Sequence, residues 1–302
     1  IMMNKKLFFF NTKTGAKEFF TASDHVTMYV CGVTPYDYAH LGHARCYVSF
    51  DLLYRLLSFC GYRVTYVRNV TDVDDKIVRK GEAELMTKGG GELKAVCQAL
   101  AQRYTAAFND DMARLGVKQP DKQPLVSDHI PQIIAFIEGL IERKHAYVAG
   151  GDVYFDVATL SSYGFLSGRK LDDLIAGARV EVGENKKNPA DFALWKGGVI
   201  GSFWQSPWGP GRPGWHIECS ALVKEYVGVT VDIHGGGIDL IFPHHENEAA
   251  QSEGLSGEPL ARYWMHNAHV TLNKEKMSKS LGNTFSVRDI LAKHDPMVVR
   301  FY

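Results

Sequence analysis

Residues 26–43 read Val26-Thr-Met-Tyr-Val-Cys-Gly-Val-Thr-Pro-Tyr-Asp-Tyr-Ala-His-Leu-Gly-His43. The β-branched and apolar run from Val26 to Val30 predicts a buried strand. Apolar residues then recur at helical spacing up to Phe59, and Gly61 provides a stop signal. The alternating run over 62–69 predicts a second strand. Because a helical crossover of this length joins parallel strands, the segment predicts an α/β fold with a nucleotide-binding parallel sheet.

The start of the predicted helix carries two histidines, His40 and His43, which flank Gly42. A helix N-terminus attracts anions, and two imidazoles there can donate hydrogen bonds to a phosphate. Gly42 has no side chain to keep a ligand's ring from the backbone. A His-x-x-His pair by itself is more typical of a plain helix surface, so the phosphate-binding interpretation depends on a second motif.

The second motif is Lys276-Met-Ser-Lys-Ser280. Together with His40-Leu-Gly-His43 it resembles the paired signature motifs of class I aminoacyl-tRNA synthetases, with Leu41 in place of the usual isoleucine. Cys31, the run Gly-Trp-His-Ile-Glu-Cys at 214–219 and the run Phe-Pro-His-His-Glu-Asn-Glu at 242–248 are similar to the cysteinyl-tRNA synthetase family. The resemblance covers nearly the whole chain.

The resemblance implies a Rossmann-type catalytic fold, a parallel sheet with helices on both faces that is interrupted by a connective insertion. We expect the two halves of the catalytic domain at 1–117 and 201–270 and the insertion at about 118–200. Residues 271–302 are expected to hold the second motif and the start of a stem-contact region. The sequence ends inside an expected helix, so we expect the catalytic part alone, with the anticodon-binding domain absent.

The resemblance also implies four zinc ligands, namely Cys31, Cys219, His244 and Glu248. Two thiolates, an imidazole and a carboxylate suit Zn²⁺. His244 and Glu248 are four residues apart, so they share one face of a helix. His245 is the competing ligand, but it is expected to point about 100° around the helix. His245 and His216 are both expected to contact the ligands and not the metal itself.

Roles for further residues follow from the same resemblance. His40 and His43 would contact the ATP phosphates, and Lys276 and Lys279 would neutralise the departing pyrophosphate. The residues expected at the nucleotide are Gly42, Gly237, Asp239 and Lys279, and those expected at the amino acid are Thr71 and Trp215. Two alternatives stay open from the residues alone. The segment around Thr71 also fits a plain acidic helix start, and the glycine triplet 235–237 also fits a tight turn.

The implied activity is ATP-dependent activation of L-cysteine to cysteinyl-adenylate, followed by transfer to the 3′ end of tRNA-Cys. Mg²⁺ is implied by ATP, and Zn²⁺ would recognise the thiolate of the substrate, which separates cysteine from serine. One alternative is a cysteine ligase that joins cysteine to an amino sugar, as in mycothiol synthesis. Another is a non-catalytic zinc-binding paralogue.

Composition limits the class of protein. The chain has 302 residues, 45% of them hydrophobic, and five cysteines without framework spacing. We therefore expect a protein of the reducing cytoplasm, monomeric and without a membrane span. The 34 Lys and Arg residues balance 34 Asp and Glu residues, whereas a tRNA-binding protein usually has a basic surplus. Either basic residues cluster on one face, or the main tRNA-binding parts lie outside this chain.

Overall fold

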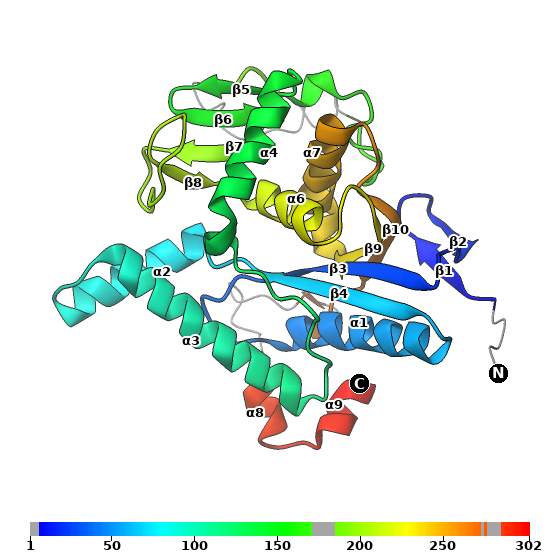
Figure 1. The fold of residues 1–302 in the computed structure, drawn as a ribbon. Helices are drawn as coiled ribbons and strands as arrows, with labels where there is room; N and C mark the ends of the chain where they lie inside the picture. Colours follow the sequence, from blue (N-terminus) through cyan, green and yellow to red (C-terminus); the bar gives the residue numbers. More distant parts are fainter. Residues whose placement is uncertain (1–5, 171–184, 273–274, 277–284) are drawn as a thin grey trace.

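The computed structural model describes residues 6–170, 185–272, 275–276 and 285–302. A four-stranded parallel sheet of order β10-β9-β3-β4 forms its centre (Figure 1). Its strands are β3 (His25–Val33), β4 (Arg63–Val70), β9 (Val231–Gly237) and β10 (Ala261–Asn267). Helix α1 (Leu41–Phe59) covers one face, and α6 (Trp215–Tyr226) and α7 (Glu246–Ser256) cover the other. The expected α/β fold with helices on both faces of a parallel sheet is confirmed.

The unit β3-α1-β4 agrees with the periodicity of its sequence. Val26, Met28 and Val30 alternate into the core under α1, and all three are fully buried. The helix ends where Gly61 adopts φ 96°, a value that glycine tolerates and other residues rarely adopt. The two strands pair in parallel, with Val26 opposite Val64. The crossover thus places the His40–His43 end of α1 at the carboxyl edge of the sheet.

A second, antiparallel sheet lies beyond α6 and α7, with strand order β5-β6-β7-β8. Its strands are β5 (Ala146–Ala149), β6 (Asp152–Phe155), β7 (Phe192–Gly197) and β8 (Gly211–Pro213). Helix α4 (Ile130–Glu142) precedes it and follows a short 3-10 turn, Val126–His129. Helix α4 ends at Glu142, and Lys144 adopts φ 66° as the chain turns into β5.

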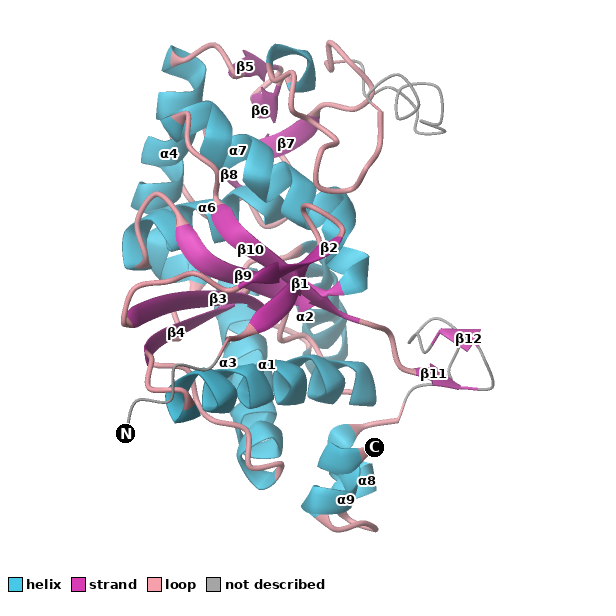
Figure 2. Cartoon of the chain, turned by 90° about the vertical axis from the view of Figure 1, so that its right-hand side faces the viewer, coloured by secondary structure: helices cyan, strands magenta, loops and turns pink. Residues whose placement is uncertain are grey.

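The remaining elements lie around the central sheet. They are β1 (Phe8–Asn11), β2 (Ala16–Phe19), α2 (Asp75–Lys88), α3 (Leu93–Arg114), β11 (Thr271–Leu272), β12 (Glu275–Lys276), α8 (Val287–Leu291) and α9 (Pro296–Phe301), with 3-10 turns at Val157–Thr159 and Ile238–Leu240 and a π-helix at Ile241–His245. Helices α8 and α9 lie beside the end of α3 and below α1 (Figure 1). The short pair β11-β12 projects away from the sheet (Figure 2). None of the described helices is long and apolar enough to cross a membrane.

The glycine triplet 235–237 does not form the tight turn that its sequence permits. All three residues belong to β9, and Gly235 pairs with Val30 of β3 and Met265 of β10. A methyl group at Gly235 would overlap the ring of Phe50 on α1. The triplet therefore lets α1 pack closely on the middle of the sheet.

Candidate active site

A cleft of about 300 Å³ opens at the carboxyl ends of the parallel strands, where ligands bind in open α/β sheets. Its walls come from β3 and the loop after it, the first turns of α1, the end of β9 and the segment after β10. Seven of the expected site residues line it: Cys31, His40, Gly42, His43, Trp215, Gly237 and Asp239. The topology therefore assembles in one cleft residues that are up to about two hundred positions apart.

His40 and His43 cap the N-terminus of α1 reciprocally. His40 Nδ1 accepts a hydrogen bond from the backbone N–H of Gly42 at 3.1 Å, and His43 Nδ1 accepts one from the backbone N–H of His40 at 3.2 Å. The two rings stack with centroids 3.8 Å apart. Because each Nδ1 accepts, each neutral imidazole carries its proton on Nε2. Two Nε2–H donors and a positive helix end are a suitable arrangement for a phosphate.

The structure describes some of the residues expected at the nucleotide fully and others only in part. A side chain at Gly42 would contact the His40 ring at 2.9 Å, so glycine keeps the helix end open. Asp239 lies in the turn after β9, 4.0 Å from His269 Nδ1 across the cleft. For Lys276 only the backbone is described, as part of β12. Lys279 lies outside the described residues.

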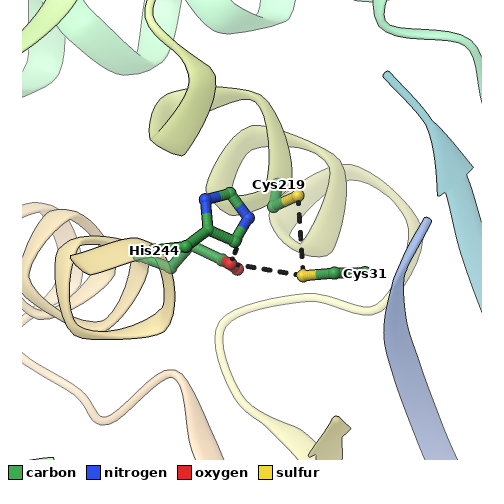
Figure 3. Close-up of side chains that lie close together, drawn as sticks. Cys31, Cys219 and His244 are labelled. Atoms are coloured by element: carbon green, nitrogen blue, oxygen red, sulfur yellow. Dashed lines mark hydrogen bonds and ion pairs between the residues drawn. The ribbon is translucent and has the colours of Figure 1, made fainter. Parts of the chain in front are cut away.

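Cys31, Cys219, His244 and Glu248 form one buried cluster, and one ligand atom of each lies within 4.8 Å of the others. Figure 3 shows Cys31, Cys219 and His244 converging from three elements. The Cys31 and Cys219 sulfurs are 3.8 Å apart, and Cys31 Sγ is 3.3 Å from Glu248 Oε1. His244 Nε2 lies 2.9 Å from Glu248 Oε1, as expected for residues four apart on one helix face. This donor set and spacing fit Zn²⁺.

Neighbouring groups set the protonation of each member of the cluster. Burial would raise the pKa of Glu248, but His234 and His244 hold it well below its usual range. A hydrogen bond from the Cys31 thiol lowers the pKa of Cys219 to about 6, while burial raises that of Cys31 well above its usual value. Burial lowers the pKa of His244, but Glu248 and Cys219 outweigh it and raise the value to about 10. Two protons thus remain, on Cys31 and His244.

His245 does not point away from the cluster as the 100° argument suggests. Its Nε2 lies 3.3 Å from Cys31 Sγ, and Cys31, His234 and His245 form a second group with metal-ligand spacing. The 100° angle assumes a regular α-helix, whereas the segment Ile241–His245 before α7 is a π-helix with a non-helical residue, Phe242. His216 occupies the expected position behind His244, with the two Nδ1 atoms 2.9 Å apart. The group of Cys31, Cys219, His244 and Glu248 offers four donors, two of them sulfurs, and fits zinc better than the group of Cys31, His234 and His245, which offers three donors.

Two histidines in the site were missed by the sequence reasoning. His234 is fully buried in β9, and its Nε2 lies 2.7 Å from Glu248 Oε2. His266 in β10 lies 2.7 Å from His245 Nδ1. Burial and His234 lower the pKa of His266 to about 3, so its ring is neutral. A usable signal existed, because both are polar residues in apolar runs near the carboxyl ends of strands.

The two expected amino-acid contacts lie at different distances from the cleft. The Trp215 ring stacks on His244 with centroids 4.1 Å apart, and 39% of the residue is exposed. Thr71 is buried and does not line the cleft, and its hydroxyl accepts a hydrogen bond from Asn69. Asn69 Oδ1 in turn lies 3.9 Å from Cys219 Sγ and accepts the N–H of Gly32 at 2.8 Å. Thr71 is thus connected to the cluster only through Asn69, which contacts both Thr71 and Cys219.

Comparison with known proteins identifies the family. The pattern described as "tRNA synthetases class I (C) catalytic domain" matches residues 19–302. The chain belongs to the cysteinyl group of the class I tRNA synthetases. It is 55% identical over 296 residues to the cysteine–tRNA ligase of Pelobacter propionicus, covering 97% of this chain and 58% of that protein. It is 53% identical to that of Trichlorobacter lovleyi, covering 97% and 59%. The chain therefore spans somewhat more than half the length of these relatives.

Solved structures support the fold independently of this sequence similarity. A methionyl-tRNA synthetase of Mycobacterium tuberculosis, bound by methionyl-adenylate, superimposes with a TM-score of 0.67 at 16% identity. The match covers 91% of this chain and 63% of that one. A protein described as a putative arginyl-tRNA synthetase, from Campylobacter jejuni, matches with a TM-score of 0.60 at 14% identity, covering 91% and 62%. The Rossmann-type catalytic fold of class I synthetases is thus shared.

Proposed function

We propose that this chain carries out the chemistry of a cysteine–tRNA ligase. It would activate L-cysteine with ATP and Mg²⁺ and pass the cysteinyl group to the 3′ end of tRNA-Cys. The single observation that carries the proposal is that the buried Cys31, Cys219, His244 and Glu248 cluster reaches, through Cys31, the same cleft that the histidine-capped end of α1 lines. Relatives named cysteine–tRNA ligase support the choice of substrates.

Recognition of cysteine would rest on a Zn²⁺ held by these four residues. When bound, the metal stabilises the thiolate of the substrate, which a serine hydroxyl cannot match at neutral pH. Trp215 would form a wall of the amino-acid pocket, because it stacks on His244 and faces the cleft. Thr71 would act through Asn69, which contacts both Thr71 and Cys219.

Activation would place the cysteine carboxylate against the α-phosphate of ATP. A bond forms from a carboxylate oxygen to the α-phosphorus, and the bond from that phosphorus to the pyrophosphate oxygen breaks. His40 and His43 would donate Nε2–H bonds to the phosphate oxygens as negative charge develops. Lys276 and Lys279 would neutralise the leaving pyrophosphate. Gly42 and Gly237 would admit the nucleotide, and Asp239 would accept hydrogen bonds from the ribose hydroxyls.

We also propose the domain division expected from the sequence, with catalytic halves at 1–117 and 201–270 and an insertion at about 118–200. The antiparallel sheet supports an insertion, since three of its four strands fall inside that range. Its last strand, β8, falls after it. Residues 271–302 would hold the second motif and the start of a stem-contact region. A monomeric cytoplasmic enzyme remains part of the proposal.

The decisive experiment is cysteine-dependent exchange of labelled pyrophosphate into ATP. We expect exchange with cysteine and none with serine. No exchange by a folded, zinc-loaded protein would support the non-catalytic paralogue instead. Charging of tRNA-Cys, compared with ligation of cysteine to an amino sugar, then separates the two ligases. Ligation to the amino sugar without tRNA charging would overturn the proposal in favour of the mycothiol-type enzyme.

A further inference from the structure

A backbone bridge joins the segment before α8 to the segment before α1. The N–H of Leu41 donates to the carbonyl of Phe285 at 3.0 Å, and the N–H of Val287 donates to the carbonyl of Ala39 at 2.9 Å. Val287 is fully buried in the core beneath α1. These bonds hold the main chain on both sides of His40.

Arg288 extends this bridge through its side chain. Its guanidinium carbon lies 4.0 Å from the centre of the Tyr38 ring, which is cation–π geometry. Its Nη2 donates to Asp111 Oδ1 at 3.2 Å and to the carbonyl of Ala107 at 3.4 Å, both on α3. Asp111 is fully buried, and burial raises its pKa while Arg288 opposes that rise. Arg288 thus connects Tyr38, two residues before His40, to a long and rigid helix.

The conformation of His40 explains why such a connection matters. His40 has φ −106° and ψ 170°, the extended geometry of a cap residue, so its orientation depends on the chain that leads into it. The reciprocal cap needs His40 and His43 to meet within hydrogen-bond distance. A shift of the Tyr38–Leu41 segment would break that cap and redirect both Nε2 donors. Errors of about 1 Å in such positions cost on the order of 100-fold in rate.

We propose that Arg288 is a positioning residue for the His40–His43 pair, acting through Tyr38 and Asp111. The inference rests on the proposed function, because the pair is assigned there to the phosphates of ATP. The contact joins Arg288 to Tyr38, which are 250 positions apart along the chain, and neither residue belongs to a signature motif. It predicts a defect in the use of ATP rather than in the recognition of cysteine.

The test is the double variant Arg288→Gln with Asp111→Asn. Removing Arg288 alone would leave the buried Asp111 carboxylate unpaired and threaten the fold, so both charges are removed together. In pyrophosphate exchange we expect kcat/KM for ATP to fall by about 10- to 100-fold. The KM for cysteine should stay within about twofold, since the metal cluster is untouched. Tyr38→Phe keeps the ring and should stay near wild type, whereas Tyr38→Leu should behave like the double variant.

A matched control exists in the second buried pair that fastens the C-terminal helices. Arg300 Nη2 on α9 lies 2.6 Å from Asp51 Oδ2 on α1, and Asp51 is 1% exposed. This pair lies outside the bridge around His40. The variant Arg300→Gln with Asp51→Asn should lose thermal stability similarly but keep kcat/KM for ATP within about twofold of wild type.

The outcomes distinguish failure of the positioning role of Arg288 from failure of the proposed function. Equal losses of ATP use in both double variants would show a general structural role and overturn the inference, as would wild-type use of ATP by the Arg288 variant. If the wild-type protein shows no exchange at all, the proposed function fails. The inference is then judged from NMR spectra of ¹⁵N-labelled histidines. Signals of His40 and His43 should shift in the Arg288 double variant and not in the Arg300 control, and unchanged spectra would refute the positioning role.

Discussion

At the scale of single residues, the site depends on groups whose protonation is set by their neighbours. In the metal-free cluster one thiol donates to the other, which leaves one sulfur ionised and one protonated. His244 carries a proton because Glu248 and Cys219 outweigh the effect of its burial. The cluster therefore has the donors of a zinc site, but it must lose protons before it can bind the metal.

The first prediction concerns these protons. At neutral pH Cys219 is already ionised, with a pKa of about 6, while Cys31 and His244, whose pKa is about 10, are still protonated. Binding of zinc should release about two protons, so the apparent affinity should rise roughly 100-fold per pH unit between about pH 6.5 and 8.5. Competition with a chelator at several pH values measures the slope. Calorimetry in two buffers counts the protons, and an affinity that does not change with pH would contradict the assignment.

The second prediction concerns Cys219→Ser. The substitution keeps the size of the side chain but replaces a soft thiolate with a poor ligand. Zinc content should fall, the KM for cysteine should rise at least about tenfold, and the preference for cysteine over serine should shrink. The KM for ATP should change little, because the His40–His43 pair is intact. Cys46→Ser, on α1 and outside the cluster, is the matched control and should retain zinc. A zinc-free, folded Cys219 variant with unaltered selectivity would assign recognition to the pocket walls.

At the scale of elements, the close packing of α1 on the sheet positions the end of that helix that carries His40 and His43. Gly235 in β9 lies directly under Phe50 of α1, and Phe50 is 3% exposed. Any side chain at this position would push the helix outward. A residue in the middle of a strand thus controls the height of α1 above the cleft.

The third prediction is therefore made on Gly235→Ala. We expect a loss of about 1–3 kcal/mol in the free energy of unfolding, as for other overpacked cores. Phe50→Leu in the same chain should recover part of that loss, because the smaller side chain makes room for the methyl group. Denaturant unfolding of the two single variants and the double variant measures the coupling. Strictly additive losses would show that the two residues do not compete for space.

At the scale of the whole molecule, β3 belongs to two hydrophobic cores. Tyr29 and Cys31 face the core under α6 and α7, whereas Met28 and Val30 face the core under α1. The Cys31, Cys219, His244 and Glu248 cluster joins β3 to α6 and α7 at the boundary between these cores. Zinc bound there would therefore stabilise the packing on both sides of β3.

The fourth prediction follows from this arrangement. Removal of zinc by a chelator should lower the melting temperature of the whole chain in a single transition. The loss should reach about 4 kcal/mol where the free zinc concentration had been about 1,000 times the Kd. Circular dichroism with and without the chelator measures it, and Cys219→Ser should show no further effect of the chelator. A melting temperature unaffected by metal removal in the wild-type protein would mean that the cluster binds no structural ion.

Local patterns determined much of this protein. The strand, helix and strand between residues 25 and 70 follow from apolar periodicity and a glycine stop, which depend only on neighbouring residues. The paired motifs at His40–His43 and Lys276–Ser280 indicate a class I synthetase, and Cys31 with the runs at 214–219 and 242–248 indicates the cysteinyl group. The pairing of His244 with Glu248 follows equally from their helical spacing.

Only the tertiary structure decided which distant residues meet. Cys31 and Cys219 are 188 positions apart and become neighbours because α6 packs on one face of the central sheet (Figure 1). His234 and His266 join the site because β9 lies beside β3 and β10 lies beside β9, and this strand order does not follow from the periodicity of any single strand. The same holds for Arg288, whose partners lie on α3 and before α1. Periodicity is a property of one segment, whereas a site is a property of the order in which segments pack.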